Sequence, residues 1–241
     1  MECVCVVGMH RSGTSCLTGI MQRFGVELGA VFTENPHNKR GNRENAEVME
    51  LNDEVLAYNG GAWNQPVEVK HWTEAHRQQR QAVINRIKSE AQGFWGFKDP
   101  RTLLTLPFWL EPGFTPRYIG TFRHPLRVMA SLNARNSIPV DEGIHLWFEY
   151  NERLLALWTA QPFPLIDFDL PDDLYISMVT NGLIHVLGPQ YSHQAEYAKE
   201  FFCKSLRSQL GVDTDGTVLP SEVAQLYGQI KDCQRSFTFE L

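Results

Sequence analysis

This sequence of 241 residues lacks several features that would narrow its function at once. No apolar run approaches the roughly 18 residues of a membrane-spanning helix, so no transmembrane segment is expected. The N-terminus has no positively charged lead and no long apolar stretch, so we expect no signal peptide and a cytoplasmic protein. The 5 cysteines show no Cys-x-x-Cys spacing, and the 8 histidines show no zinc-site spacing on a plausible helix. No metal site is therefore predicted.

The sequence also lacks an excess of positive charge. It has 22 Lys and Arg against 28 Asp and Glu, which gives a formal net charge of −6. A chain of this charge is not expected to bind a nucleic-acid polymer through bulk electrostatics, although a local basic pocket for a small anion is compatible with it. We find no internal repeat and no convincing linker. The sequence therefore predicts one domain over residues 1–241.

Short apolar segments alternate with amphipathic ones along the chain. This alternation predicts an α/β fold of three layers, in which a central, mostly parallel sheet is flanked by helices and the C-terminal part is helical. The predicted strands are 3–7, 94–97, 117–122 and 165–168. The predicted helices are 14–24, 44–58, 73–92, one that starts at Pro125, 141–159, 171–187, 194–209 and 220–235, with a loop over 29–43.

The stretch from Gly8 to Ser15 follows the first predicted strand and leads into a helix. Gly8 and Gly13 have the spacing of a phosphate-binding loop, but Thr14 stands where a nucleoside-triphosphate enzyme has its Lys. Backbone N–H groups at a helix N-terminus favour an anion, and Arg11 adds a bidentate cationic donor. The plain alternative is a tight strand-to-helix turn. We interpret the stretch as an anion-binding loop.

A second polar junction follows the strand predicted at 117–122. Arg123 lies at its end, where a P-loop NTPase usually carries an acidic residue that organises Mg²⁺. Ser131 lies about two turns into the next helix. Arg123 and Ser131 are therefore candidates for gripping a second phosphate, with a surface Arg and a helix-face Ser as the alternative.

Candidate catalytic groups follow at two other places. Lys98 and Asp99 end the strand predicted at 94–97, at the edge where open α/β sheets bind ligands. Lys98 is a candidate for stabilising charge on a transferring group, and Asp99 for acting as a base or orienting Lys98. Glu44, which we expect to open a helix, is a candidate general base. A salt-bridged loop and a solvated capping Glu are the structural alternatives.

Together, these segments resemble the sulfotransferases that use 3′-phosphoadenosine 5′-phosphosulfate (PAPS). The likeness covers roughly residues 3–135 and is strongest to a bacterial branch of the family, with some similarity to tyrosylprotein sulfotransferases. It is carried by Gly8-Met9-His10-Arg11-Ser12-Gly13-Thr14-Ser15, Arg40-Gly41-Asn42-Arg43-Glu44-Asn45, Lys98-Asp99-Pro100-Arg101 and the pair Arg123 and Ser131.

The resemblance implies PAPS as donor, no metal, and in-line transfer of a sulfuryl group to a hydroxyl or amine. By this likeness, the donor's 5′-phosphosulfate lies on Arg11, Ser12, Gly13, Thr14 and Ser15, and its 3′-phosphate on Arg123 and Ser131. Arg11 and Lys98 would stabilise the leaving group. The implied base is Glu44, followed by Glu34 and then Asp99.

Some questions stay open at this level. The acceptor is a small molecule, a carbohydrate, a lipid or a peptide, and no motif selects among Arg207, Lys231 and Arg235 as further ligands of the 3′-phosphate. The family branch has aromatic residues where this chain has Asn42-Arg43. The alternatives are an atypical P-loop nucleotide kinase, which needs a Lys from elsewhere, and a non-catalytic module that binds the same nucleotide. The sequence does not determine the oligomeric state.

Overall fold

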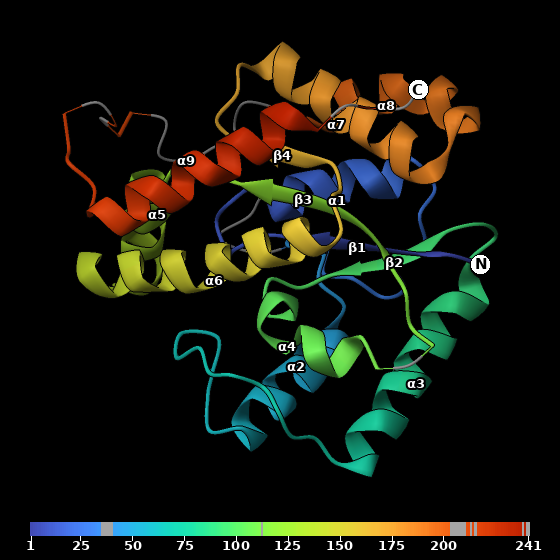
Figure 1. Cartoon of the computed structure of the whole chain (residues 1–241). Coiled ribbons are helices and arrows are strands. Elements are labelled where there is room, and N and C mark those ends of the chain that lie inside the picture. The colour runs from blue at the N-terminus through green and yellow to red at the C-terminus, as the bar shows by residue number, and fades with distance from the viewer. Residues whose placement is uncertain are drawn as a thin grey trace.

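A four-stranded sheet in the order β2-β1-β3-β4 forms the centre of the molecule (Figure 1). The computed structural model describes residues 1–34, 41–111, 113–202, 211, 212, 214, 216–237 and 239. All three neighbouring strand pairs are parallel. The strands are β1 (Cys3–Val7), β2 (Trp95–Lys98), β3 (Arg117–Phe122) and β4 (Leu165–Asp167).

Every residue of the central strand β1 is buried, because helices cover both faces of the sheet. Cys3, Cys5 and Val7 belong to one hydrophobic cluster, whereas Val4 and Val6 belong to another. This division follows from the two-residue period of a strand, in which successive side chains point to opposite faces. The sequence of β1 therefore supplies apolar side chains to both outer layers.

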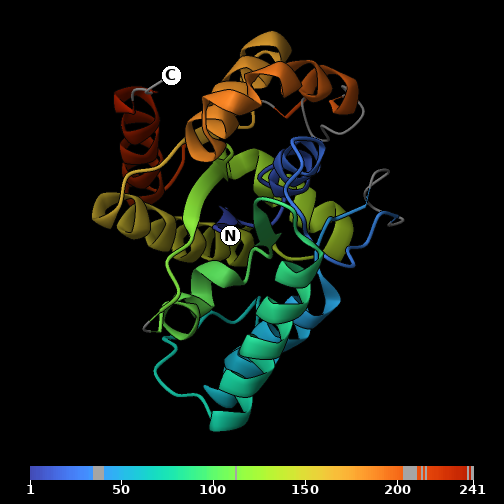
Figure 2. The ribbon, with the colours of Figure 1, turned by 90° about the vertical axis from the view of Figure 1, so that its right-hand side faces the viewer.

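The helices form the two layers around the sheet. Their bounds are α1 (Thr14–Arg23), α2 (Ala46–Tyr58), α3 (Glu74–Glu90), α4 (Thr102–Trp109), α5 (Pro125–Asn136), α6 (Val140–Ala160), α7 (Asp172–Leu187), α8 (Ala195–Phe201) and α9 (Ser221–Ser236), with a 3₁₀ turn at Pro189–Gln194. Helices α1, α7 and α8 pack on one face, and α2, α4, α6 and α9 on the other. Figure 1 shows α7 and α8 above the sheet and α2 and α4 below it. Figure 2 shows α2 and α3 side by side, at the end of the molecule away from α7 and α8.

The order of the strands places the predicted anion loop in a favourable position. From β1 the chain continues to β2 on one side, and it then crosses to β3 on the other side of β1. In open parallel sheets, a reversal of this kind leaves a crevice at the carboxyl ends of the two strands on either side of it. The loop from Gly8 follows β1, and Arg123 follows β3. Both segments therefore reach the same crevice.

The predicted fold class is confirmed, while several element boundaries are corrected. Helix α4 was not predicted, because Pro107 lies within it and proline disfavours the helix interior. The helix predicted from 44 starts at Ala46, with Asn45 as its N-cap, so Glu44 precedes it. Of the helix predicted at 194–209, α8 covers Ala195–Phe201, Gln194 ends the preceding 3₁₀ turn, and residues 203–210 lie outside the described part.

None of the helices in the described residues is long and apolar enough to cross a membrane.

Candidate active site

The anion loop makes a tight turn between β1 and α1. Gly13 is the N-cap of α1 with φ 89°, and a Cβ there would lie 2.3 Å from the Phe168 ring. Arg11 has φ 66°, a left-handed conformation that is uncommon for a residue with a side chain. Strain of this kind concentrates at ligand-binding sites. The turn leaves the first N–H groups of α1, which starts at Thr14, without partners inside the helix.

Strand β3 packs against the loop and forms a hydrogen bond with it. A Cβ at Gly8 would lie 2.3 Å from the Thr121 carbonyl oxygen, and the Thr121 hydroxyl donates to the Ser12 carbonyl oxygen at 2.8 Å. Ser12 is fully buried, yet its own hydroxyl has no hydrogen-bond partner among the described residues. Folded proteins rarely bury a polar group without a partner, and a bound ligand can supply the missing hydrogen bond. Ser12 is therefore compatible with a loop that binds an anion.

Arg11 connects the loop to helix α5. Its Nε donates to Ser131 Oγ at 2.8 Å. Burial and the nearby charges of Arg135 and Arg123 lower the pKa of Arg11 to about 10. The guanidinium remains charged at neutral pH. The structure thus brings together two residues that the sequence assigned to different phosphates.

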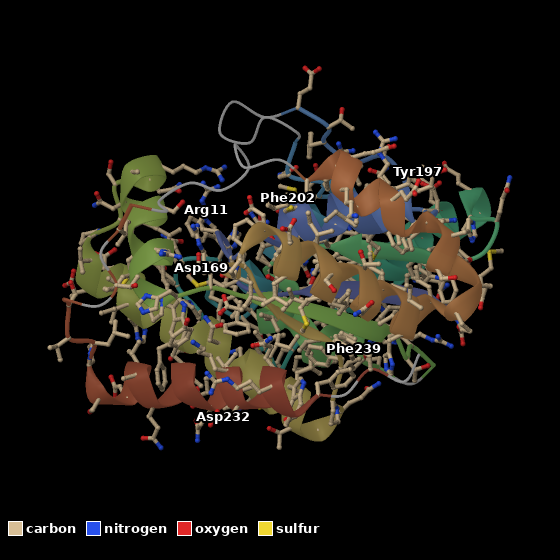
Figure 3. The ribbon with its side chains drawn as sticks, turned by 90° about the horizontal axis from the view of Figure 1, so that it is seen from above. Arg11, Asp169, Tyr197, Phe202, Asp232 and Phe239 are labelled. Carbon is tan, nitrogen blue, oxygen red and sulfur yellow. The ribbon has the colours of Figure 1, made fainter. Side chains whose placement is uncertain are left out.

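Arg123 and Ser131, which the sequence pairs as ligands of one phosphate, have different partners among the described residues. The Arg123 side chain is 1% exposed, and its Nε donates to Asp169 Oδ1 at 3.0 Å. Its Nη1 donates to the Arg11 carbonyl oxygen at 3.4 Å, and its guanidinium lies 5.2 Å from the centre of the Phe168 ring. Figure 3 shows Arg11 and Asp169 near each other beside α5. Arg123 therefore lies beneath the loop, with Asp169 as a counter-charge.

Lys98 and Glu44 form a buried ion pair next to the loop. Lys98 Nζ lies 2.6 Å from Glu44 Oε1 and 3.4 Å from Ser15 Oγ. Asn42 Nδ2 donates to the other carboxylate oxygen of Glu44 at 2.7 Å. The exposed fractions of the two charged side chains are 1% for Lys98 and 11% for Glu44. Lys98 thus lies between the loop hydroxyl of Ser15 and the candidate base.

Asp99 is placed differently from its predicted role. It is fully buried and accepts hydrogen bonds from Arg101 and Asn52, and its described contacts do not include Lys98. Burial raises the pKa of Asp99, and the neighbouring Glu44 acts in the same direction, against the lowering effect of Arg101. Asp99 therefore holds Arg101 and does not orient Lys98. As a buried group it is also inaccessible to an acceptor in this structure.

A pocket of about 360 Å³ opens above these groups. It is lined by His10, Arg11, Thr14, Ser15, Phe32, Asn42, Glu44, Met49, Trp63, Pro100, Arg101, Leu132, Arg135 and Asn136. The predicted loop and the first-choice base thus face the same cavity. Phe32 and Trp63 form an aromatic part of its wall. The pocket therefore has aromatic side chains, although this chain lacks the aromatic residues that the family branch has at Asn42-Arg43.

His10 packs in this wall between two aromatic rings. Its ring centroid lies 5.0 Å from that of Trp63 and 5.6 Å from that of Tyr150. Burial, reinforced by the surrounding cationic side chains, holds the pKa of His10 well below its usual range. The imidazole is therefore neutral at physiological pH.

Several other candidates lie away from the pocket. Glu34 is exposed and does not line the pocket, and Arg43 points to α1, where it donates to Gln22 Oε1 at 2.8 Å. Lys231 Nζ lies 5.4 Å from the centre of the Tyr227 ring, and Arg235 forms an exposed ion pair with Asp232. Figure 3 shows Asp232 on α9. Arg207, the third C-terminal candidate, lies outside the described residues.

Three contributors to the site were not predicted from the sequence. Asp169 follows β4 and neutralises Arg123, Asn42 holds Glu44, and Arg135 lines the pocket one turn beyond Ser131. The four-residue spacing of Ser131 and Arg135 was visible in the sequence and places both on one helix face. No local signal could have paired Asp169 with Arg123. In the described part of the chain, no group of His, Cys, Asp and Glu side chains has a metal-binding arrangement.

Comparisons with known proteins give weak similarities. No protein-family model matches the chain, and no curated protein sequence matches it. A sulfotransferase domain of the Synechococcus PCC 7002 olefin synthase aligns over 100% of this chain and 90% of that chain, with 16% identity and a TM-score of 0.42. A sulfotransferase domain from the curacin biosynthetic pathway aligns over 95% and 97%, with 13% identity and a TM-score of 0.47. Because identities and TM-scores are low, we infer function from this chain's own side chains.

Proposed function

We propose that this chain is a sulfotransferase that uses PAPS as donor and a hydroxyl or amine as acceptor. The observation that carries the proposal is a pocket lined by Arg11, by the N-terminus of α1 and by Glu44. Next to this pocket, Lys98 donates to both Glu44 and Ser15. A protein of net charge −6 here keeps three guanidinium groups, those of Arg11, Arg101 and Arg135, at one cavity. Such a pocket favours an anionic ligand.

The residues present fit the anionic part of the donor. Helix α1 presents its N-terminal backbone N–H groups, the buried Ser12 hydroxyl has no hydrogen-bond partner among the described residues, and Arg11 adds a fixed positive charge. The donor supplies a sulfuryl group whose bond to the 5′-phosphate oxygen breaks as a bond from sulfur to the acceptor oxygen or nitrogen forms. The bonding electron pair stays on the phosphate oxygen.

The side chains around the pocket have distinct tasks in this proposal. Arg11 and Lys98 stabilise negative charge that develops on the leaving phosphate oxygen, a type of preorganised donor worth about 3 kcal/mol each in known enzymes. Glu44 accepts the proton that leaves the acceptor, and Asn42 fixes the direction of its carboxylate. Phe32 and Trp63 form the apolar wall against which the acceptor lies.

A second candidate function is a non-catalytic module that binds the same nucleotide. Both carboxylate oxygens of Glu44 already accept hydrogen bonds, one from Lys98 and one from Asn42. Contacts of this kind also suit a structural ion pair that takes no part in catalysis. The kinase alternative has less support, because Thr14 stands in place of the loop Lys and Arg123 in place of the acidic residue that organises Mg²⁺.

The experiment uses adenosine 3′,5′-bisphosphate and the Glu44→Gln variant. We expect calorimetry to show micromolar binding of the nucleotide to wild type and to the variant alike. Turnover of PAPS with a broad acceptor panel should fall about 100-fold or more in the variant, the usual scale for loss of a general base. Glu50→Gln, an exposed substitution on α2, serves as the matched control and should behave as wild type.

Three outcomes separate the hypotheses. Absence of nucleotide binding to folded wild-type protein would rule out both the sulfotransferase and the binding module. Nucleotide binding without turnover on any acceptor supports the module. Magnesium-dependent binding of ATP in preference to the bisphosphate supports the kinase.

A further inference from the structure

His10 carries a polar atom that the fold itself does not satisfy. Its side chain lines the pocket, and its Nε2 is buried without a hydrogen-bond partner among the described residues. An imidazole nitrogen donates or accepts a hydrogen bond in either tautomer, so a buried one without a partner is an exception that requires a reason. A polar group of a ligand in the pocket would supply the missing bond.

Two aromatic residues fix the position of this ring. Trp63 packs against it with ring centroids 5.0 Å apart, and Tyr150 of α6 meets it edge-on at 5.6 Å. The Tyr150 hydroxyl also donates to the Trp63 carbonyl oxygen at 2.8 Å, which ties the turn around Trp63 to α6. A ligand therefore meets an imidazole and an indole that are already ordered, and this lowers the entropic cost of binding.

The charged side chains closest in effect to the imidazole are paired with carboxylates. After burial, Arg101 and Lys98 contribute most to lowering the imidazole pKa, and the ring is neutral. Arg101 lies 3.0 Å from Asp99 and 2.7 Å from Asp53. Lys98 lies 2.6 Å from Glu44. A charged acceptor group at this place would lose its hydration without gaining an unpaired opposite charge, whereas an uncharged group would not.

An apolar surface continues from the imidazole to the opening of the pocket. It is formed by Phe32, Met49, Trp63 and Pro100. Phe32 is 46% exposed, so its ring retains apolar area that a ligand can bury. Its backbone N–H donates to the Glu44 carbonyl oxygen at 3.1 Å, which places this surface beside the candidate base.

We propose that His10 is a specificity-determining residue for the acceptor, and that the acceptor is an uncharged alcohol with an apolar body. The imidazole forms a hydrogen bond with the acceptor hydroxyl, while Trp63 and Phe32 cover the apolar body. A hydroxyl oxygen can take part in this bond and still direct its proton to Glu44. The role as an acceptor rests on the proposed function, whereas the binding of such an alcohol beside His10 does not.

The test compares benzyl alcohol with toluene, which has the same ring without the hydroxyl. Both are titrated by NMR into protein saturated with adenosine 3′,5′-bisphosphate. In wild type, the imidazole nitrogen signals of His10 should shift strongly with benzyl alcohol and only slightly with toluene. This measurement needs no variant, so it decides the question even where a substitution prevents folding.

Variants separate hydrogen bonding from packing. His10→Phe keeps an aromatic ring against Trp63 but removes both nitrogens. It should lower the ratio of the benzyl alcohol affinity to the toluene affinity about tenfold, the scale of one hydrogen bond. His10→Gln keeps a hydrogen-bonding group and should retain part of this ratio. His145→Phe, the same substitution at an exposed position of α6, should match wild type.

A third probe tests the charge of the acceptor. Benzyl alcohol with a carboxylate on its ring should bind the saturated wild type at least about tenfold more weakly than benzyl alcohol does. Tighter binding of the carboxylate would overturn the uncharged class. If wild type binds neither benzyl alcohol nor toluene, or if the affinity ratio is the same in His10→Phe, the role of His10 is wrong. If wild type binds no bisphosphate, the proposed function fails, and the same titrations of the free protein still decide the role of His10.

Discussion

Substitution of Gly13 by Ala tests the packing on which the anion loop depends. Gly13 combines a φ of +89° with a Cβ position only 2.3 Å from Phe168 Cδ2. A left-handed conformation costs a residue with a Cβ roughly 1–2 kcal/mol, and overpacking typically adds about 1–3 kcal/mol. The free energy of unfolding should therefore fall by about 2–5 kcal/mol. Urea denaturation followed by circular dichroism measures this change.

Gly25 provides the matched control. It has a φ of +85°, but a Cβ there would meet nothing within 4 Å. Gly25→Ala should cost only the backbone term of roughly 1–2 kcal/mol. In Gly13→Ala, a further Phe168→Leu substitution should recover part of the loss by making room. Equal losses for the two alanine variants, or no recovery with Phe168→Leu, would show that the contact with the ring does not constrain the loop.

Two further predictions concern the buried ion pairs. Lys98→Met leaves the Glu44 carboxylate without its cation and should lower the free energy of unfolding by about 3–5 kcal/mol. The double variant Lys98→Met with Glu44→Gln should lose less, and a double-mutant cycle by urea denaturation measures the difference. Additive losses would contradict a direct interaction. Burial would raise the pKa of Asp169, but Arg123, with further hydrogen bonds, lowers it below its ordinary value. Its stabilisation is therefore present above pH ~4 and lost as pH falls through the folded-state pKa, so the destabilisation caused by Asp169→Asn should shrink on acidification. A pH-independent difference would contradict this sign.

The fold was predictable from the sequence because its signals are local. Apolar runs at the strands, helical periodicity after them and the Gly8-to-Gly13 spacing all lie within short windows. The contacts between charged side chains were not predictable in the same way. Glu44 meets Lys98 across 54 residues, and Arg123 meets Asp169 across 46. Pairing at this distance depends on the strand order, which brings separate loops to one sheet edge.

The clearest divergence between sequence and structure concerns a stripe of residues four apart that runs from the end of β3 along α5. Its members are Arg123, Arg127, Ser131 and Arg135. The first two contact Asp169, the third accepts from Arg11, and the last is exposed at the pocket, with no carboxylate partner among the residues that the structure describes. The spacing in the sequence predicts that these residues share one face, but it does not predict how deeply each side chain is buried. Because Asp169 lies near the start of the stripe, its first two members are paired with a carboxylate, whereas the last lines the cavity.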